Sequence, residues 1–168
     1  MNLLENEYHP YYLPYINLTA NDDIVEGLEY NLKHVVEFYN SIPAHKLDYA
    51  YAEGKWTIKD ILLHCIDAER IFAYRALRIS RQDKTNLAGF EQNGYVEAGK
   101  ASDRSLERLL EEFTTTRKAN ISLFQSFSDK QMQSIGTASN SNVSVRALGY
   151  IITGHENHHI NVIKERYL

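Results

Sequence analysis

The chain has 168 residues, enough for one domain with a single core, and its 18 basic and 22 acidic residues give a net charge of −4. This balance argues against electrostatic binding of nucleic acid, which requires a clustered positive surface. The single cysteine, Cys65, excludes an internal disulfide framework and a cysteine-rich zinc module, and favours a reducing compartment such as the cytoplasm. Neither a signal peptide nor a membrane-spanning run of about 18 apolar residues is expected.

The first half of the chain predicts an arm and two helices. Residues 1–20 combine two prolines with several tyrosines and predict an extended aromatic arm. A first helix is expected between Asn21, a favourable N-cap, and Pro43, which ends it. A second helix begins at Thr57, because Thr57 and Asp60 have the spacing of a capping box.

Two further helices follow, each after a long polar connection. The connection at 83–102 precedes a third helix, expected from about Ser102 to Ser126, and includes one short helical turn near Tyr95. The connection at 128–143 precedes the last helix, which Ser144 caps and which runs to the C-terminus. No alternation typical of strands is present. The prediction is an all-α protein, with residues 1–168 folding as one up-down four-helix bundle.

The last helix carries a histidine pair on its apolar stripe. At about 100° per residue, His155 and His159 fall on the same side as the apolar residues Leu148 and Ile151, whereas His158 lies at the margin. Histidines four residues apart can present two imidazoles to one metal ion, although this spacing alone is a weak signal.

A third histidine, His64, lies on the core side of the predicted second helix. A lone histidine on an apolar face is more often a hydrogen-bonded core residue than a ligand. Three imidazoles in one core, however, all need polar partners, and one divalent ion would satisfy them and leave a coordination position open. Three further histidines are not expected to be ligands. His9 and His45 lie beside prolines in irregular segments, and His34 lies next to Val35 on the first helix.

Other polar and aromatic residues near these helices have open alternatives. Asp67 either orients an imidazole from outside the ligand set or is a solvated carboxylate. Arg75 either holds an anionic substrate group or pairs with an acidic residue of a neighbouring helix. Glu69 and Glu156 are expected to be surface or ion-pair residues, and Trp56 to be a core anchor at the start of the second helix. Cys65 is expected to be a small buried hydrophobe.

Two segments resemble the DinB/YfiT-like family. "GKWTIKDILLHCIDAERIFAYRALRISRQD" (54–83) is similar to the second-helix signature of that family, and "HENHHINVIKERY" (155–167) to its closing histidine helix. The segments "YHPYYLPYINL" and "GFEQNGYVEAG" are also similar to family segments. The resemblance implies an up-down four-helix bundle with one divalent metal held by His64, His155 and His159. Many members have Arg-Gly-Gln after the last histidine, where this chain has Ile160-Asn161-Val162.

The resemblance implies a metal-dependent enzyme that activates water or a low-molecular-weight thiol, acting as a hydrolase or as a thiol S-transferase on a small molecule. Zinc or nickel is the expected ion, and a homodimer the expected assembly. The alternative is a non-catalytic metal-binding or dimerising helical bundle. An open cavity at the metal would favour the enzyme, and a closed four-ligand site the alternative.

Overall fold

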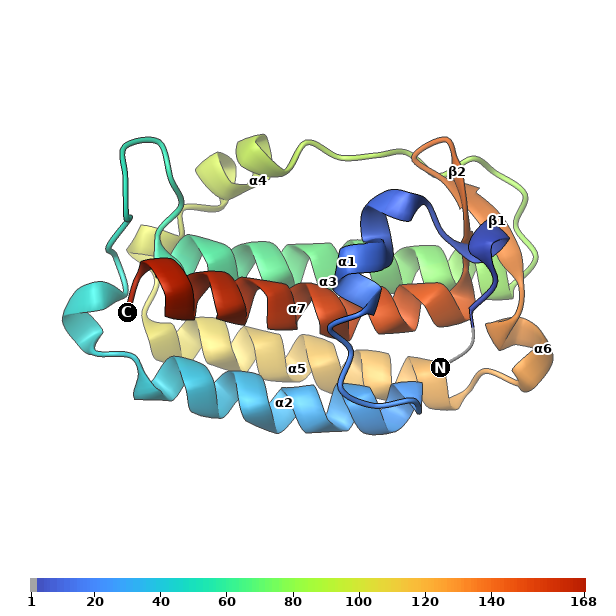
Figure 1. Ribbon diagram of the computed structural model, residues 1–168, viewed down its shortest axis with the longest axis horizontal. Coiled ribbons are helices and arrows are strands. Elements are labelled where there is room, and N and C mark those ends of the chain that lie inside the picture. Colours follow the sequence, from blue (N-terminus) through green and yellow to red (C-terminus); the bar gives the residue numbers. More distant parts are fainter. Residues whose placement is uncertain (1–2) are drawn as a thin grey trace.

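The computed structural model describes residues 3–168 and is dominated by four long helices that pack side by side as a bundle (Figure 1). No helix in this part of the chain combines the length and the apolar character needed to cross a membrane. The four helices are α2 (Ile24–Ser41), α3 (Ile58–Ser80), α5 (Leu106–Gln125) and α7 (Val145–Arg166).

Each long helix begins at a residue whose side chain accepts a backbone N–H of the first turn. The predicted caps Thr57 and Ser144 are confirmed, and Thr57 forms a complete capping box with Asp60. The first helix is capped by Asp23 rather than by the predicted Asn21. Local capping chemistry therefore fixes where the helices of the bundle start.

The helices do not alternate in direction throughout. α3 packs against α5 and α7, and α2 packs against the same two helices, so α2 and α3 lie on opposite corners of the bundle. α3 and α5 run parallel, as do α2 and α7 (Figure 1). The expected alternation holds from α2 to α3 and from α5 to α7, but not from α3 to α5. The reason is the connection over residues 81–105, which returns along the length of the bundle before α5 begins.

Both long connections contain regular structure. The first holds α4 (Gln92–Gly99), consistent with the helical turn expected near Tyr95. The second holds α6 (Asp129–Met132) and an antiparallel hairpin of β1 (Ile135–Ala138) and β2 (Ser141–Ser144). The prediction that no strands occur is wrong at this hairpin. Its strands are too short to show an alternating pattern, and its two-residue turn depends on positive φ at Ser139 and Asn140.

The N-terminal arm is folded rather than extended, which corrects the prediction for residues 3–20; residues 1–2 lie outside the described part. It forms two single turns of 3₁₀-helix and then α1 (Leu13–Ile16). Pro10 and Pro14 each stand at the start of a short helix, where the missing N–H has no consequence. α1 packs closely on α7 at Gly154, and the absence of a side chain there permits this approach. A Cβ at Gly154 would overlap the carbonyl oxygen of Tyr15.

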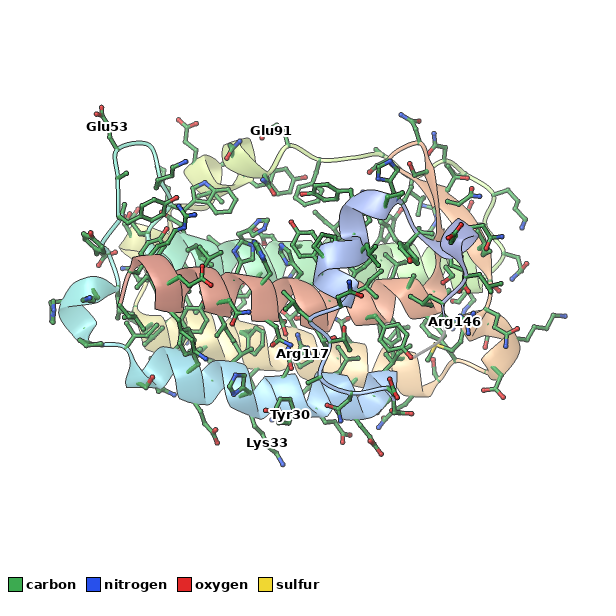
Figure 2. The ribbon with its side chains drawn as sticks, in the orientation of Figure 1. Tyr30, Lys33, Glu53, Glu91, Arg117 and Arg146 are labelled. Atoms are coloured by element: carbon green, nitrogen blue, oxygen red, sulfur yellow. The ribbon has the colours of Figure 1, made fainter. Side chains whose placement is uncertain are left out.

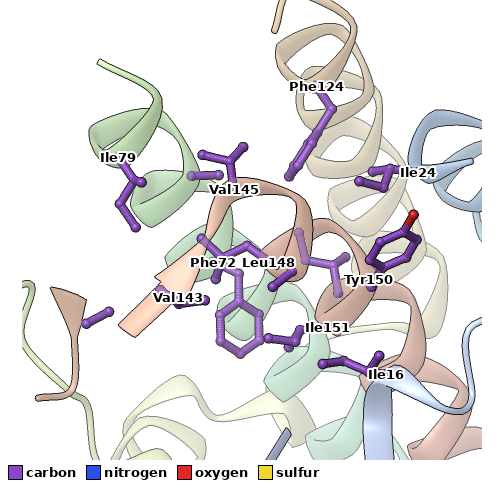
Figure 3. Packing of buried hydrophobic residues seen from close by; sticks show 14 of the residues in the cluster. Ile16, Ile24, Phe72, Ile79, Phe124, Val143, Val145, Leu148, Tyr150 and Ile151 are labelled. Carbon is purple, nitrogen blue, oxygen red and sulfur yellow. The ribbon is translucent and has the colours of Figure 1, made fainter. Parts of the chain in front are cut away.

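The apolar core forms two clusters along the bundle, separated by a polar layer. One cluster includes Phe72 of α3 and Leu148 of α7 and lies towards the hairpin (Figure 3). The other includes Leu62 of α3 and Ile163 of α7 and lies towards the C-terminus. Buried polar residues of α3 and α7, among them Glu69, His155 and Glu156, lie near the boundary between these clusters.

Candidate metal centre

Three imidazoles from two helices converge on one point. Nε2 of His155 lies 3.1 Å from Nε2 of His64 and 3.1 Å from Nε2 of His159, and the ligand atoms of all three lie within 4.8 Å of one another. With metal–nitrogen bonds of about 2.0–2.1 Å, neighbouring nitrogens of a tetrahedral site are about 3.3 Å apart. The spacing of the three rings therefore fits one divalent ion.

Aromatic residues from three parts of the chain hold these rings in place. The Trp56 ring packs on His64 with 4.8 Å between centroids, and the Tyr15 ring packs edge-on against His155 at 5.4 Å. Phe72, about one turn along α3 from Ala68, also packs edge-on against His155 at 6.2 Å. The arm, the connection before α3 and α3 itself thus restrict the orientation of the cluster.

Burial keeps the three imidazoles neutral. It lowers the pKa of His64 to about 4 and that of His159 to about 3, the latter helped by the neighbouring His64. The pKa of His155 is also lowered, by burial and then by the two other histidines. Near neutral pH the three rings therefore have lone pairs available for a metal without first losing a proton.

The other histidines lie outside this cluster. His158 packs against Tyr15 and His159, and its nitrogens do not join the converging set. His9 accepts a hydrogen bond from the backbone of the arm, and His34 stacks on Tyr30 of α2.

A cavity of about 610 Å³ opens beside the three imidazoles. Its wall is built from α3, α7, the arm, the connection before α3, the start of α4 with the connection before it, and the tip of the hairpin. The residues that line it are Tyr11, Tyr12, Tyr15, Trp56, His64, Ala68, Phe72, Arg75, Gly89, Phe90, Glu91, Gln92, Ser139, His155, His158 and His159. The volume is within the range of small-molecule sites, so the cluster is accessible to a substrate.

The structure separates the two polar residues that the sequence singled out near His64. Asp67 lies 3.5 Å from Arg70 and contacts no imidazole of the cluster; burial raises the pKa of its carboxyl, against the opposing charge of Arg70. Arg75, in contrast, lies on the cavity wall and is buried.

Trp56 and Cys65 are both placed near the cluster. Trp56 is half-buried and borders the cavity as well as anchoring the start of α3, so its ring is part of the site wall. Cys65 is buried, as expected, and burial raises the pKa of its thiol. The thiol is therefore not an activated nucleophile.

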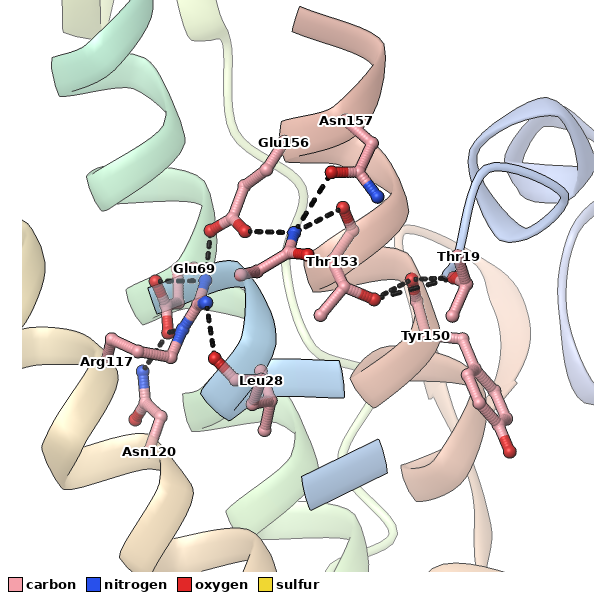
Figure 4. A network of polar contacts seen from close by, with 10 residues as sticks. Thr19, Leu28, Glu69, Arg117, Asn120, Tyr150, Thr153, Glu156 and Asn157 are labelled. Carbon is pink, nitrogen blue, oxygen red and sulfur yellow. Dashed lines mark hydrogen bonds and ion pairs between the residues drawn. The ribbon is translucent and has the colours of Figure 1, made fainter. Parts of the chain in front are cut away.

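The prediction for Glu69 and Glu156 is right about ion pairing and wrong about the surface. Both are buried and both pair with Arg117 of α5, which is fully buried. Asn31 of α2 donates to Glu156 at 2.9 Å, so side chains of all four long helices meet inside the bundle (Figure 4). Asn120 also donates to Glu69, at 3.1 Å.

The buried position of Arg117 was not predicted, although the sequence contains a signal for it. Arg117 stands four residues after Phe113 and seven before Phe124, and so lies on the apolar stripe of α5. A long cation on that stripe indicates a buried partner of opposite charge. In Figure 2 Arg117 lies among the helices, whereas Tyr30 and Lys33 point away from α2.

The fold and the three converging histidines define the chain as a helical bundle with a candidate metal site. Comparison with known families shows which family of such bundles it belongs to. The model of the DinB superfamily matches residues 28–163, so the chain belongs to that superfamily.

The chain is also similar to a solved structure, YfiT from Bacillus subtilis, at 16% identity and a TM-score of 0.69, covering 98% of this chain and 90% of that one. YfiT is described as a probable metal-dependent hydrolase with an unusual four-helix bundle topology. The search of curated proteins finds no match to the chain.

Proposed function

We propose that the protein is a metal-dependent enzyme. One divalent ion, zinc or nickel, is held by His64, His155 and His159, and a small molecule reacts in the adjoining cavity by hydrolysis or by transfer to a low-molecular-weight thiol. The observation that carries this proposal is the meeting of three neutral imidazole nitrogens in the wall of an open cavity of about 610 Å³.

Three protein ligands beside a cavity suit catalysis better than structural binding. A structural site closes its coordination sphere with a fourth protein ligand, whereas a catalytic one leaves a position for water or substrate. Within residues 3–168, the converging set holds only the three histidines. When bound, the ion supplies Lewis acidity and lowers the pKa of a coordinated water or thiol. The description of YfiT supports the same class of activity.

The chain's own residues would bind and shield the substrate. Burial, together with the neighbouring Tyr11, raises the pKa of Tyr15, so its hydroxyl stays protonated and can donate a hydrogen bond to an oxygen that gains charge. The Tyr15 ring lies against both His155 and His158, and its hydroxyl lies 3.3 Å from that of Tyr11. Trp56 and Phe72 form apolar parts of the wall and exclude water.

Elemental analysis of untagged, freshly purified protein tests the metal. We expect one divalent ion per chain, a loss of most of it when any of the three ligands is replaced by alanine, and nearly unchanged occupancy in His158→Ala. A folded protein that takes up no zinc or nickel, or a His64→Ala protein that keeps stoichiometric metal, would contradict the proposal.

The reaction is tested by screening esters, amides and electrophilic small molecules with the metal-loaded protein, with and without added thiols. Turnover without a thiol identifies a hydrolase, and turnover that depends on the thiol identifies an S-transferase. Metal-loaded protein that turns over no substrate in either series would favour the non-catalytic bundle.

A further inference from the structure

Arg75 is a buried cation whose partners are neutral. The residue is 3% exposed, and its Nη2 donates to the carbonyl oxygen of Ala88 at 2.8 Å and to Oγ of Ser139 at 3.1 Å. Within residues 3–168 no carboxylate forms an ion pair with it, whereas Arg78, one turn further along α3, pairs with Asp83. Because removing a charge from water is costly, a buried arginine without an anion indicates that a ligand supplies one.

The contacts of Arg75 with the protein use only part of the guanidinium. Two hydrogen bonds leave from Nη2 and tie the connection before α4 to the tip of the hairpin, and the Tyr12 hydroxyl also interacts with the guanidinium. An arginine has five N–H donors, three of them on Nε and Nη1, and these suit the two oxygens of a carboxylate or phosphate. The hydrogen bonds that hold the connection before α4 therefore leave N–H donors of Arg75 for an anion.

The position of Arg75 connects it with the histidine cluster. Arg75 and the three histidines line the same cavity, and Phe72 lies between them: its ring centroid is 5.9 Å from Cζ of Arg75 and 6.2 Å from the His155 ring. An apolar segment of a ligand could therefore rest on Phe72 while its two ends reach the metal and the arginine.

The rest of the wall does not neutralise Arg75. Among the described residues that line the cavity, Glu91 has the only carboxylate, and that carboxylate accepts the N–H groups of Asn93 and Gly94 as the cap of α4. Tyr12 lies beside the guanidinium, and burial raises the pKa of its hydroxyl although Arg75 opposes the shift. The neighbours of Arg75 are therefore neutral hydrogen-bonding groups that can help to bind an oxyanion.

We infer that the cavity selects substrates with an oxyanion at one end, a carboxylate or a phosphate-like group, which Arg75 binds while the reacting group lies at His64, His155 and His159. This inference rests on the proposed metal-dependent function and specifies its substrate class. Arg75 acts as the specificity-determining residue, and the apolar surface of Phe72 sets the distance between the two ends of the substrate.

Binding of ligands with two functional ends tests the inference. The monohydroxamates of succinic, glutaric and adipic acids carry a metal-binding hydroxamate and a carboxylate, and each is compared with its neutral carboxamide and its phosphonate on zinc-loaded protein by calorimetry. We expect at least one chain length at which an oxyanion binds about 10-fold or more tightly than the carboxamide, because hydrogen bonds to ions are about twice as strong as neutral ones. The carboxylate and phosphonate series show which oxyanion is preferred.

Two variants locate the effect. In Arg75→Gln the preference for the oxyanion should disappear while the carboxamide keeps its affinity within about 3-fold, a change of less than about 1 kcal/mol. Arg75→Lys, which keeps the charge, should retain part of the preference. Arg78→Gln is the matched control on the same helix, and should keep all of it.

Three results would overturn the inference. Equal binding of oxyanion and carboxamide by the wild-type protein would show that the cavity does not select for charge. A preference for the oxyanion that survives in Arg75→Gln would mean that the carboxylate binds the metal itself. An equal loss of affinity for both ligands in that variant would mean that Arg75 only holds the connection before α4 in place. Failure of every hydroxamate to bind, or of the protein to take up zinc, would instead contradict the proposed function.

Discussion

Helices α3 and α7 carry two buried polar clusters at the same level of the bundle, on opposite sides of the helix pair. The inner cluster joins Glu69 and Glu156 to Arg117, and all of its charges find partners within the protein. The outer cluster brings together three neutral imidazoles that face a cavity. The contrast indicates that the inner cluster specifies how the four helices pack, whereas the outer one is completed by a ligand.

The two clusters depend on adjacent residues of one helix. His155 and Glu156 are consecutive, and consecutive side chains on a helix diverge by about 100°. One therefore faces the cavity and the other the interior, where Asn31 and Arg117 contact it. α7 contributes to both sites in this way, and α1 of the arm packs on it beside the histidines.

Removing the cation of the inner cluster should have the largest effect on stability. Arg117→Met leaves two buried carboxylates without a counter-ion, and breaking a buried pair in this way costs about 3–5 kcal/mol. Urea denaturation of the metal-free protein measures the loss. Arg108→Met, which removes an exposed pair with Glu111, should cost less than about 1 kcal/mol. Equal stability of Arg117→Met and the wild-type protein would show that the inner cluster does not hold the bundle together.

Removing a ligand of the outer cluster should weaken metal binding rather than the stability of the metal-free protein. His64→Ala should weaken zinc binding by more than the roughly 10–100-fold expected for an outer-shell residue. Zinc at 100 times its Kd should stabilise the wild-type protein by about 2.7 kcal/mol, and the variant should lose this effect. Calorimetric titration and thermal unfolding with and without zinc measure both quantities. If zinc still stabilised the His64→Ala protein fully, the outer cluster would not be the metal site.

The arm that covers the outer cluster is tested at Gly154. Gly154→Ala would drive a methyl group into the backbone of Tyr15, so we expect α1 to be displaced at a cost of about 1–3 kcal/mol. Gly27→Ala on α2 is the matched control, since its Cβ would meet only atoms at ordinary contact distance, 3.6 Å and more. That control should gain up to about 1 kcal/mol from helix propensity. Limited proteolysis of the arm reads out the displacement, and an arm equally protected in both variants would contradict the expectation.

The smallest effect is expected at Asp67. Because its carboxylate contacts Arg70, Asp67→Asn should change zinc affinity by less than about 3-fold, whereas a residue that orients His64 would change it by about 10–100-fold. Stability should change by less than about 0.5 kcal/mol, as for other partly exposed sites. A large loss of zinc affinity in this variant would show that Asp67 orients an imidazole of the cluster, the alternative that the sequence left open.

Features that depend on residues close together in the chain could be predicted from the sequence. The caps Thr57 and Ser144, and therefore the starts of α3 and α7, follow from side chains that bond to the backbone three residues away. The pairing of His155 with His159 follows from the pitch of one helix. His64 could be assigned to the same candidate metal site because it was the one other histidine on an apolar helix face.

Which polar residue of α7 faces the interior depends on contacts with other helices. α7 is buried on nearly all sides along its middle, so its periodicity allows either His155 or Glu156 to point inwards. Arg117 settles the choice, because a fully buried guanidinium must lie beside the carboxylates that compensate it. The parallel course of α3 and α5 and the folding of the arm over α7 likewise depend on contacts between distant segments, which no local pattern contains.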